Sequence, residues 1–155
     1  MVARTRFDTD PCPVARSVDS IGDWWSLLIV RDAFDGSRRF VEFQRSLGIA
    51  KNILAARLRT LEGAGVMRRT PAADGGAHQE YVLTEKGRDL FPVVVALRQW
   101  GEAHCFAPGE AHSRLLDRET GRPLRPLDVR SEDGRPVGPR ETVVKKLDGG
   151  GAAAR

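Results

Sequence analysis

Apolar residues recur every three or four positions over the first third of the chain and predict three short helices. The first begins at Pro13, a residue suited to the first helical turn. The second runs from about Asp23 to Phe34, with a carboxylate where the helix dipole favours negative charge, and the third ends at Gly48. Their apolar faces are, in chain order, Val14, Val18 and Ile21, then Trp25, Leu28 and Ile29, then Phe40, Phe43 and Leu47.

The next stretch, from Ala50 to Thr70, reads AKNILAARLRTLEGAGVMRRT and predicts an amphipathic helix that breaks at Gly63 and Gly65. At about 100° per residue, one side of this helix is aliphatic, with Ile53, Leu54, Leu58 and Leu61. The other side carries Asn52, Ala55, Ala56, Arg59 and Gly63. Two short helices joined by a tight turn that contains Gly are the outline of a helix-turn-helix, whose second helix enters a DNA groove.

After the glycines, VMRRT and QEYVL predict two strands of a hairpin around the eight-residue loop PAADGGAH. Thr84 then caps a long helix, EKGRDLFPVVVALRQWGEAHCF, which we expect Pro92 to kink or restart. Its apolar seam advances in steps of four and three and indicates a partner: Leu90, Val94, Leu97, Gly101 and His104. The whole pattern predicts a mainly α fold with a small β-hairpin wing (α+β), a winged helix-turn-helix with flanking helices.

Composition changes along the chain near Phe106. Residues 1–106 contain all three Trp, all six Phe and the single Tyr, whereas residues 107–155 are rich in Gly, Pro, Arg and Asp. We therefore expect a flexible arm at residues 1–9, a compact domain at residues 10–106 and an extension at residues 107–155.

The extension contains an internal repeat, because Gly-Arg-Pro at residues 121–123 recurs at residues 134–136. Each copy combines a β-prone run, an acidic turn and a proline. The scarcity of large apolar residues leaves two alternatives open, disorder and a small β-meander. ETVVKKL at 141–147 is a candidate last strand, and GGGAAAR at 149–155 is expected to be disordered.

Positive charge is concentrated in the middle of the chain. The formal net charge is +4, but residues 38–69 carry eight Lys or Arg against two Glu, a local balance of +6, so the remainder sums to −2. A concentrated patch raises the local potential enough to attract a polyanion. A solvated basic face without a partner is the alternative interpretation.

The polar face of the predicted helix at 51–63 suits base edges in the major groove of DNA. Asn52 can pair with adenine and Arg59 with guanine through two hydrogen bonds each. Ala55 and Ala56 let the helix come close to the bases, and an alanine methyl can touch a thymine methyl. We predict that these four residues read the bases.

Other basic residues suit phosphates, which give affinity and salt dependence but little sequence information. They are Arg38, Arg39, Arg45, Lys51, Arg68 and Arg69. Arg57 lies near the edge of the apolar face, so an internal ion pair and a DNA contact both stay open. The tip of the wing, with Gly75, Gly76 and His78, is flexible enough to follow an adjacent minor groove, although Asp74 argues against the tip as the main anchor.

Several classes of site are not predicted. Two cysteines, Cys12 and Cys105, are too few for a secreted disulfide framework, so we expect free thiols. No apolar run is long enough for a signal peptide or a membrane span, so we expect a cytoplasmic protein. His104, Cys105 and His112 lack a standard metal-ligand spacing, and we predict no metal and no cofactor. A thiol enzyme would need a base beside its cysteine, and the histidines lie far from Cys12 in sequence, so no enzyme is predicted.

Residues 10–106 resemble the HxlR family of bacterial winged-helix regulators, relatives of the MarR group. The resemblance rests on Cys-Pro before the first helix, the tryptophans of the second helix, Gly-Val leading into Arg-Arg, and LTEKG before the last helix. It implies a homodimer, held by the first and last helices, that binds an inverted repeat in a promoter. The interface residues would be Val14, Val18, Leu90, Val94, Leu97 and Gly101.

Other family features bear on single residues. The family usually has Ser or Thr where this chain has Ala50, so the cap of the following helix is absent. Members often carry a sensing cysteine at the position of Cys12, where the helix N-terminus and Arg16 favour a thiolate while Asp8 and Asp10 oppose it. A buried, inert thiol is the alternative for Cys12 and the expectation for Cys105. The extension resembles the zinc-ribbon-like tail of some members without its cysteine ligands.

These observations together predict a dimeric, sequence-specific regulator of transcription that binds double-stranded DNA. We expect a repressor rather than an activator, released by a small-molecule effector or by thiol modification. A winged-helix module that binds protein or RNA without operator specificity is the alternative.

Overall fold

The computed structural model describes residues 6–147. The expected arm at 1–9 therefore lies partly outside the described residues, and the GGGAAAR end lies wholly outside them. The chain divides into two compact units, Met1–Val94 and Val95–Arg155, here named the N-terminal unit and the C-terminal unit.

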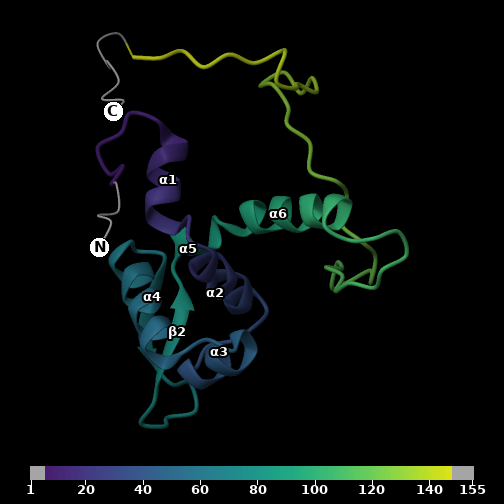
Figure 1. The fold of residues 1–155 in the computed structure, drawn as a ribbon. Helices are drawn as coiled ribbons and strands as arrows, with labels where there is room; N and C mark the ends of the chain where they lie inside the picture. Colours follow the sequence, from purple (N-terminus) through teal and green to yellow (C-terminus); the bar gives the residue numbers. More distant parts are fainter. Residues whose placement is uncertain (1–5, 148–155) are drawn as a thin grey trace. The chain divides into compact units, whose positions relative to one another are not determined.

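The N-terminal unit is a winged helix-turn-helix (Figure 1). Its four leading helices are α1 (Pro13–Ile21), α2 (Trp24–Phe34), α3 (Phe40–Leu47) and α4 (Lys51–Gly63). A hairpin of β1 (Met67–Pro71) and β2 (Gln79–Leu83) follows, then α5 (Glu85–Arg88) and α6 (Phe91–His104), which continues into the C-terminal unit. The predicted α+β fold with a hairpin wing is confirmed.

Local capping groups set the ends of these helices. Asp23 accepts a hydrogen bond from the backbone N–H of Ser26 (3.0 Å) and caps α2. Gly48 ends α3 in the left-handed conformation at φ 61°, which glycine adopts without strain. Thr84 caps α5 by accepting from the N–H of Gly87 (3.0 Å). Ala50, as expected, provides no side-chain cap for α4.

The hydrophobic core lies between α2, α3, α4 and the start of the hairpin. Its fully buried side chains are Ile29, Val30, Phe43, Leu54, Leu58, Leu61, Val66 and Met67. The prediction that Ile53 belongs to this face is wrong, since its side chain is 38% exposed. Helix α4 buries a narrower stripe than predicted, at steps of four and three from Leu54.

The two strands pair antiparallel, with Met67 opposite Leu83 and Pro71 opposite Gln79. The loop is therefore residues 72–78, shorter than the predicted eight residues because Pro71 belongs to the strand. The segment that precedes α3 also joins the hairpin, because the N–H of Tyr81 donates to the carbonyl of Arg38 at 2.7 Å.

The long helix predicted after Thr84 is in fact two helices. α5 ends at Arg88, and α6 begins at Phe91 with Pro92 in its first turn, where a missing amide hydrogen costs no helical hydrogen bond. The predicted restart near Pro92 is confirmed. α5 also packs closely on the chain before the wing, since a Cβ on the buried Gly87 would lie 2.1 Å from the carbonyl oxygen of Val66.

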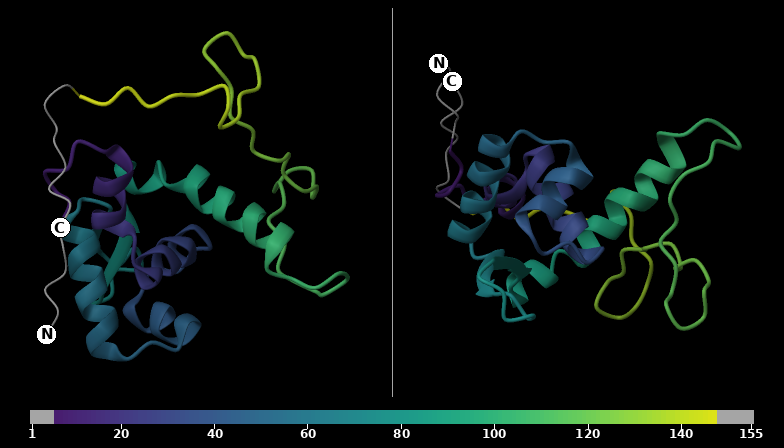
Figure 2. Two further views of the ribbon diagram at one scale, coloured as in Figure 1. Left: turned by 45° about the horizontal axis from the view of Figure 1, so that its top comes forward. Right: turned by 90° about the horizontal axis from the view of Figure 1, so that it is seen from below.

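In the C-terminal unit the two repeats form two closed turns, visible as loops in Figure 2. Single antiparallel bridges close them, Leu116 with Pro123 and Arg130 with Pro136. Gly121 and Gly134 turn the chain at φ 66° and 84°. The extension is thus a pair of closed turns rather than a meander. The strand predicted at 141–147 is wrong, because this segment has no regular structure and leaves its valines unpaired and exposed.

Side chains of α6 hold the extension within the C-terminal unit. Arg98 donates to the carbonyl of Ser113 at 3.0 Å. The amide of Gln99 donates to the carbonyl of Arg125 at 3.0 Å and accepts from the N–H of Leu127 at 2.8 Å. Across residues 6–147, no helix has the length and apolar character that a bilayer crossing requires.

Candidate nucleic-acid interface

Helices α3 and α4 are joined by the three residues 48–50. The N–H of Gly48 donates to the carbonyl of Gln44 at 2.9 Å, which closes α3, and Ile49 is buried. Ala50 has extended geometry and its carbonyl accepts the first hydrogen bond of α4, from the N–H of Leu54 at 3.0 Å. The turn therefore buries one residue and leaves the first turn of α4 exposed.

The outer face of α4 carries the four residues predicted to read bases. Asn52 and Arg59 are exposed, and Ala55 and Ala56 lie half-buried between them. Within residues 6–147 neither the amide of Asn52 nor the guanidinium of Arg59 is engaged by another side chain or by the backbone. Both groups are therefore available as hydrogen-bond donors beside a surface of small side chains, as readout in the major groove requires.

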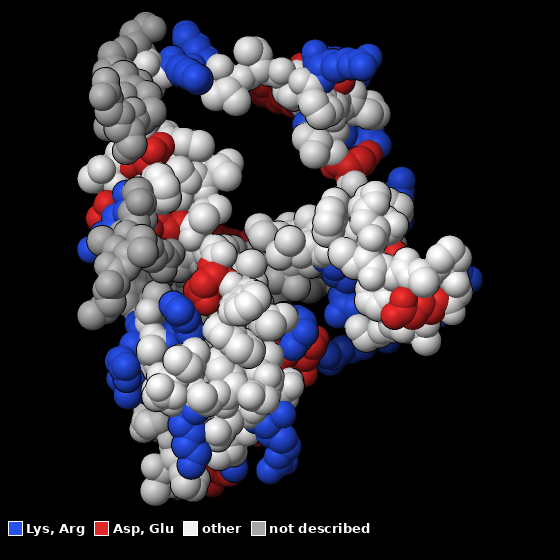
Figure 3. Space-filling view, viewed as in Figure 1, with Lys and Arg blue, Asp and Glu red and all other residues white. Residues whose placement is uncertain are grey.

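The six cations predicted to contact phosphates fall into two groups. Arg45, Lys51 and Arg68 are exposed and make no hydrogen bond or ion pair with another described residue. The other three are engaged: Arg38 with Glu80 at 3.6 Å, Arg69 with Glu62 at 2.8 Å, and Arg39 with Asp74. Figure 3 shows Lys and Arg side chains around the part of the molecule formed by α3, α4 and the hairpin.

Arg57 forms an ion pair with Asp23, the capping residue of α2. Its Nε lies 3.4 Å from the carboxylate, and its side chain is 33% exposed. Of the two interpretations left open by the sequence, the internal ion pair is confirmed. The pair links the recognition helix α4 to the start of α2.

Glu80 is a site residue that sequence reasoning missed. It is 7% exposed, and its carboxylate lies 3.6 Å from Nη1 of Arg38 and 4.0 Å from Nε of Arg39. No spacing in the sequence indicates this cluster, because the hairpin brings together residues from distant parts of the chain. The cluster fixes β2 to the segment that leads into α3.

The tip of the wing is attached to the same segment. Asp74 accepts from the N–H of Gly76 at 3.0 Å and pairs with Arg39, and these two interactions hold the pKa of Asp74 below its usual range. Gly75, at φ 73°, Gly76 and His78 are exposed. The tip therefore has an exposed backbone, while the ion pair of Asp74 with Arg39 attaches the loop to the segment before α3.

Both cysteines are exposed. The alternative of a buried, inert thiol is therefore wrong for Cys12, and the same expectation is wrong for Cys105. Cys12 is the N-cap residue of α1, and its N–H donates to the carboxylate of Asp10 at 2.7 Å. The described residues contain no cluster of three or more side chains that could hold a metal ion.

The residues predicted to form a dimer interface differ in exposure. Val14 and Val18 of α1 are 69% and 50% exposed, and Leu97 of α6 is 50% exposed. Leu90 and Val94 instead pack, partly buried, against the core of their own chain, and Gly101 is half-buried. The exposed large apolar side chains of α6 are Phe91, Val93, Leu97 and Trp100.

Comparison with known proteins gives the same assignment as the fold. Residues 20–108 match the family described as HxlR-like helix-turn-helix. The chain is 44% identical over 95 residues to the uncharacterized HTH-type transcriptional regulator Rv3095 of Mycobacterium tuberculosis, covering 61% of this chain and 60% of that protein. This chain thus spans less than two thirds of the length of that relative. It is 37% identical over 94 residues to the uncharacterized HTH-type transcriptional regulator YybR of Bacillus subtilis, covering 60% and 75%.

Solved structures extend the similarity to both units. The crystal structure of PA1607, a proposed transcription factor, is 57% identical, covers 92% of this chain and 100% of its own, and superposes with a TM-score of 0.88. The redox regulator HypR in its oxidized form is 36% identical, covers 62% of this chain and 100% of its own, with a TM-score of 0.56. Because the family match covers more than half of the sequence, the chain belongs to the HxlR-like helix-turn-helix family.

Proposed function

We propose that this protein is a transcriptional regulator that binds a specific sequence of double-stranded DNA through α4. The observation that carries the proposal is the outer face of α4, where Asn52 and Arg59, on either side of Ala55 and Ala56, are donors that no other residue of 6–147 engages. The relatives named as HTH-type transcriptional regulators support it. Such a protein acts where chromosomal DNA is found, in agreement with the cytoplasmic location expected from the sequence.

Within this proposal the basic residues have separate roles. Arg45, Lys51 and Arg68 bind phosphates, because none of them forms an ion pair with a carboxylate of residues 6–147. Arg38, Arg39 and Arg69 chiefly hold the wing through their ion pairs. The salt dependence separates the two groups. For a dimer on one operator, three phosphate contacts per protomer give a slope of log K against log salt near about −5.4, and six per protomer give about −10.8.

The regulator is proposed to act as a homodimer. Val14, Val18 and Leu97 are large apolar side chains that a single chain leaves in water, and a second copy would bury them. A two-fold axis would place the two α4 helices about one turn of DNA apart, ~34 Å, and match an inverted repeat. Occupancy of a promoter by such a dimer excludes RNA polymerase, which makes repression the expected effect.

The test is retention of the full chain on DNA from upstream of its own gene, compared with a shuffled duplex, over a salt series. We expect preference for the upstream DNA, and we expect Arg59→Ala to weaken it by about 1 to 3 kcal/mol and to relax the choice at one base. Arg118→Ala, which removes an exposed charge from the extension, is the matched control. Weak binding that ignores sequence would favour a protein-interaction module, and preference for RNA would favour the other alternative.

An exposed thiol favours a second candidate property, regulation by thiol modification. Cys12 lies at the start of α1, the helix proposed to form the dimer, so an adduct there would sit against the partner. The relative HypR is named a redox regulator and is solved in oxidized and reduced forms. Footprinting with and without N-ethylmaleimide tests this: protection lost in the parent and kept in Cys12→Ser supports it, whereas protection that ignores the reagent rejects it.

A further inference from the structure

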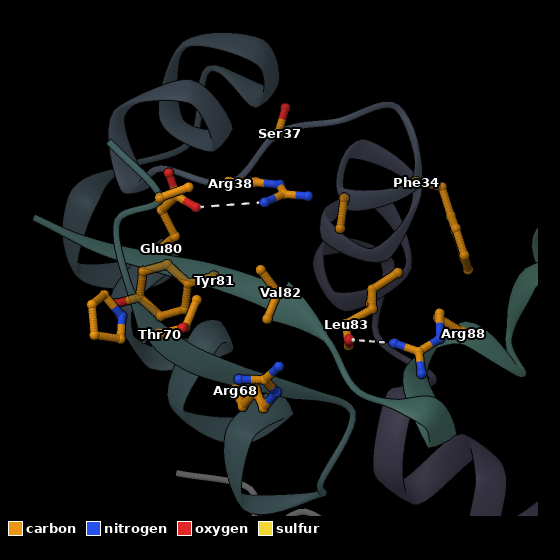
Figure 4. A pocket seen from close by; sticks show the side chains of 13 residues that line it. Phe34, Ser37, Arg38, Arg68, Thr70, Glu80, Tyr81, Val82, Leu83 and Arg88 are labelled. Atoms are coloured by element: carbon orange, nitrogen blue, oxygen red, sulfur yellow. Dashed lines mark hydrogen bonds and ion pairs between the residues drawn. The ribbon is translucent and has the colours of Figure 1, made fainter. Parts of the chain in front are cut away.

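A groove of about 640 Å³ lies along the outer side of the hairpin. Its walls come from the end of α2, the segment before α3, both strands and α5, and α4 contributes no lining residue. Figure 4 shows how Phe34, Val82 and Leu83 line it together with Arg38, Arg68 and Arg88. The groove is therefore separate from the four residues proposed to read DNA bases, but it shares Arg68 with the side chains proposed to bind phosphates.

The groove has an excess of positive charge. Three guanidinium groups line it against one carboxylate, Glu80, which is almost buried and already paired with Arg38 at 3.6 Å. Arg88 donates only to the carbonyl of Leu83, at 3.2 Å, and Arg68 has no ion-pair partner among residues 6–147. Two guanidinium groups thus have no carboxylate partner in the part of the chain that the structure describes, and a planar carboxylate is the group that binds guanidinium through two parallel hydrogen bonds.

The remaining lining is apolar. Phe34, Val82, Leu83 and Tyr81 offer aromatic and aliphatic surface, with small side chains at Ala33, Pro71 and Ala73. A sugar-phosphate backbone presents only small C–H groups between its charged oxygens, whereas an organic acid can place a larger apolar body on this surface. The volume is in the range of small-molecule sites in proteins, roughly 300 to 1,000 Å³.

We propose that this groove binds an organic carboxylate with an apolar body. The carboxylate pairs with Arg88 and Arg68, and the body lies on Val82 and the ring of Phe34. The bound acid is the effector of the regulator, an assignment that rests on the proposed function.

The position of the groove explains how such a ligand would alter DNA binding. Arg38 directly precedes Arg39, the N-cap residue of α3, so one wall leads into the helix-turn-helix. The ring of Phe34 packs edge-on against Phe91, the first residue of α6, with centroids 5.2 Å apart. A ligand between these walls contacts the segments that lead to the recognition helix and to the proposed dimer helix. Binding of the ligand therefore changes the affinity for DNA if the ligand prefers one arrangement of these two segments over another.

The experiment is calorimetric titration of the full chain, without DNA, by 2-naphthoate and by octanoate, each compared with its neutral amide. We expect at least one acid to bind about tenfold or more tightly than its amide, because a hydrogen bond to a charged group is worth more than a neutral one. Arg88→Gln should weaken the acid about tenfold, and Val82→Glu should abolish its binding by placing a carboxylate in the groove. Arg118→Gln is the control and should bind as the parent does.

The results separate this site from the proposed function. Equal binding of acid and amide, no acid binding, or binding that ignores both groove variants would overturn the site. Weaker DNA binding by Arg88→Gln without any acid binding would also overturn it, since the groove would then serve phosphates. Acid binding by a protein that shows no operator preference would support the site and reject the regulator. An operator affinity that changes with acid in the parent but not in Val82→Glu would support both.

Discussion

The uncapped start of α4 gives the most direct test of how the sequence builds the recognition helix. Ala50 is exposed and already holds the extended geometry of an N-cap residue, φ −65° and ψ 141°. No side chain accepts a hydrogen bond from the amides of the first turn, and that turn contains no acidic residue. The substitution Ala50→Ser therefore adds a hydroxyl where the backbone needs no rearrangement to use it.

The expected gain follows from capping energetics. Ser in place of Ala at an N-cap stabilises a helix by about 1 kcal/mol, because one otherwise unpaired amide gains an acceptor. For a unit of this size that free energy raises the melting temperature by about 4 to 8 °C. The same hydrogen bond restrains Lys51 and Asn52, so the affinity for a specific operator should rise while the salt slope stays unchanged.

Thermal unfolding followed by circular dichroism measures this effect at one fixed protein concentration, because dimerisation would otherwise alter the melting temperature. Ala77→Ser, at an exposed position in the wing loop, is the matched control for adding a hydroxyl. If Ala50→Ser raises the melting temperature no more than Ala77→Ser does, the amides of the first turn do not limit the stability of α4 and the reasoning is refuted.

Four further substitutions test other parts of the structure by unfolding. Gly87→Ala should lower the free energy of unfolding by about 1 to 3 kcal/mol, since the new Cβ would overlap the carbonyl of Val66. Gly63→Ala has free space for its Cβ and should raise the free energy of unfolding by up to about 1 kcal/mol. Equal effects of the two substitutions would contradict the close packing of α5. Glu42→Gln should destabilise α3 at neutral pH. The N–H groups of Arg39 and Arg38 hold the pKa of Glu42 below its ordinary 4.5. The stability that the Glu42 carboxylate contributes is therefore present above pH 4.5 and is lost as the pH falls through the lowered pKa. A stability difference between the parent and Glu42→Gln that persists in acid would refute this. Arg57→Ala should cost less than about 1 kcal/mol of stability and leave the base preference of the folded protein intact, and a changed base preference would return Arg57 to the DNA-binding set.

The parts of the fold that the sequence predicts are those determined by neighbours in the chain. Asp23 before α2, Gly48 after α3 and Thr84 before α5 each act on amides or carbonyls within a few residues, so their effect is visible in the sequence. The restart at Pro92 is equally local.

Tertiary contacts decide the features that the sequence did not reveal. Arg39 and Arg45 look alike in sequence, but the hairpin brings Asp74 and Glu80 to Arg39, whereas no carboxylate of the described residues lies within ion-pair distance of Arg45. The exposure of Ile53 depends on the rotation of α4 about its axis relative to the core. A period of 3.6 residues determines this rotation only to within about one residue position.

The ion pairs of the wing explain why the basic surface proposed to bind DNA includes arginines that are already paired with carboxylates. Arg39 holds the tip through Asp74, Arg38 holds β2 through Glu80, and Arg69 holds β1 to α4 through Glu62. Each pair joins the hairpin to α4 or to the segment that leads into α3. A wing fixed in this way loses less conformational entropy when DNA binds, so more of the energy of each phosphate contact remains as affinity. The carboxylates thus reduce the net positive charge of the surface but fix the wing, from which Arg68 is proposed to reach the backbone of DNA.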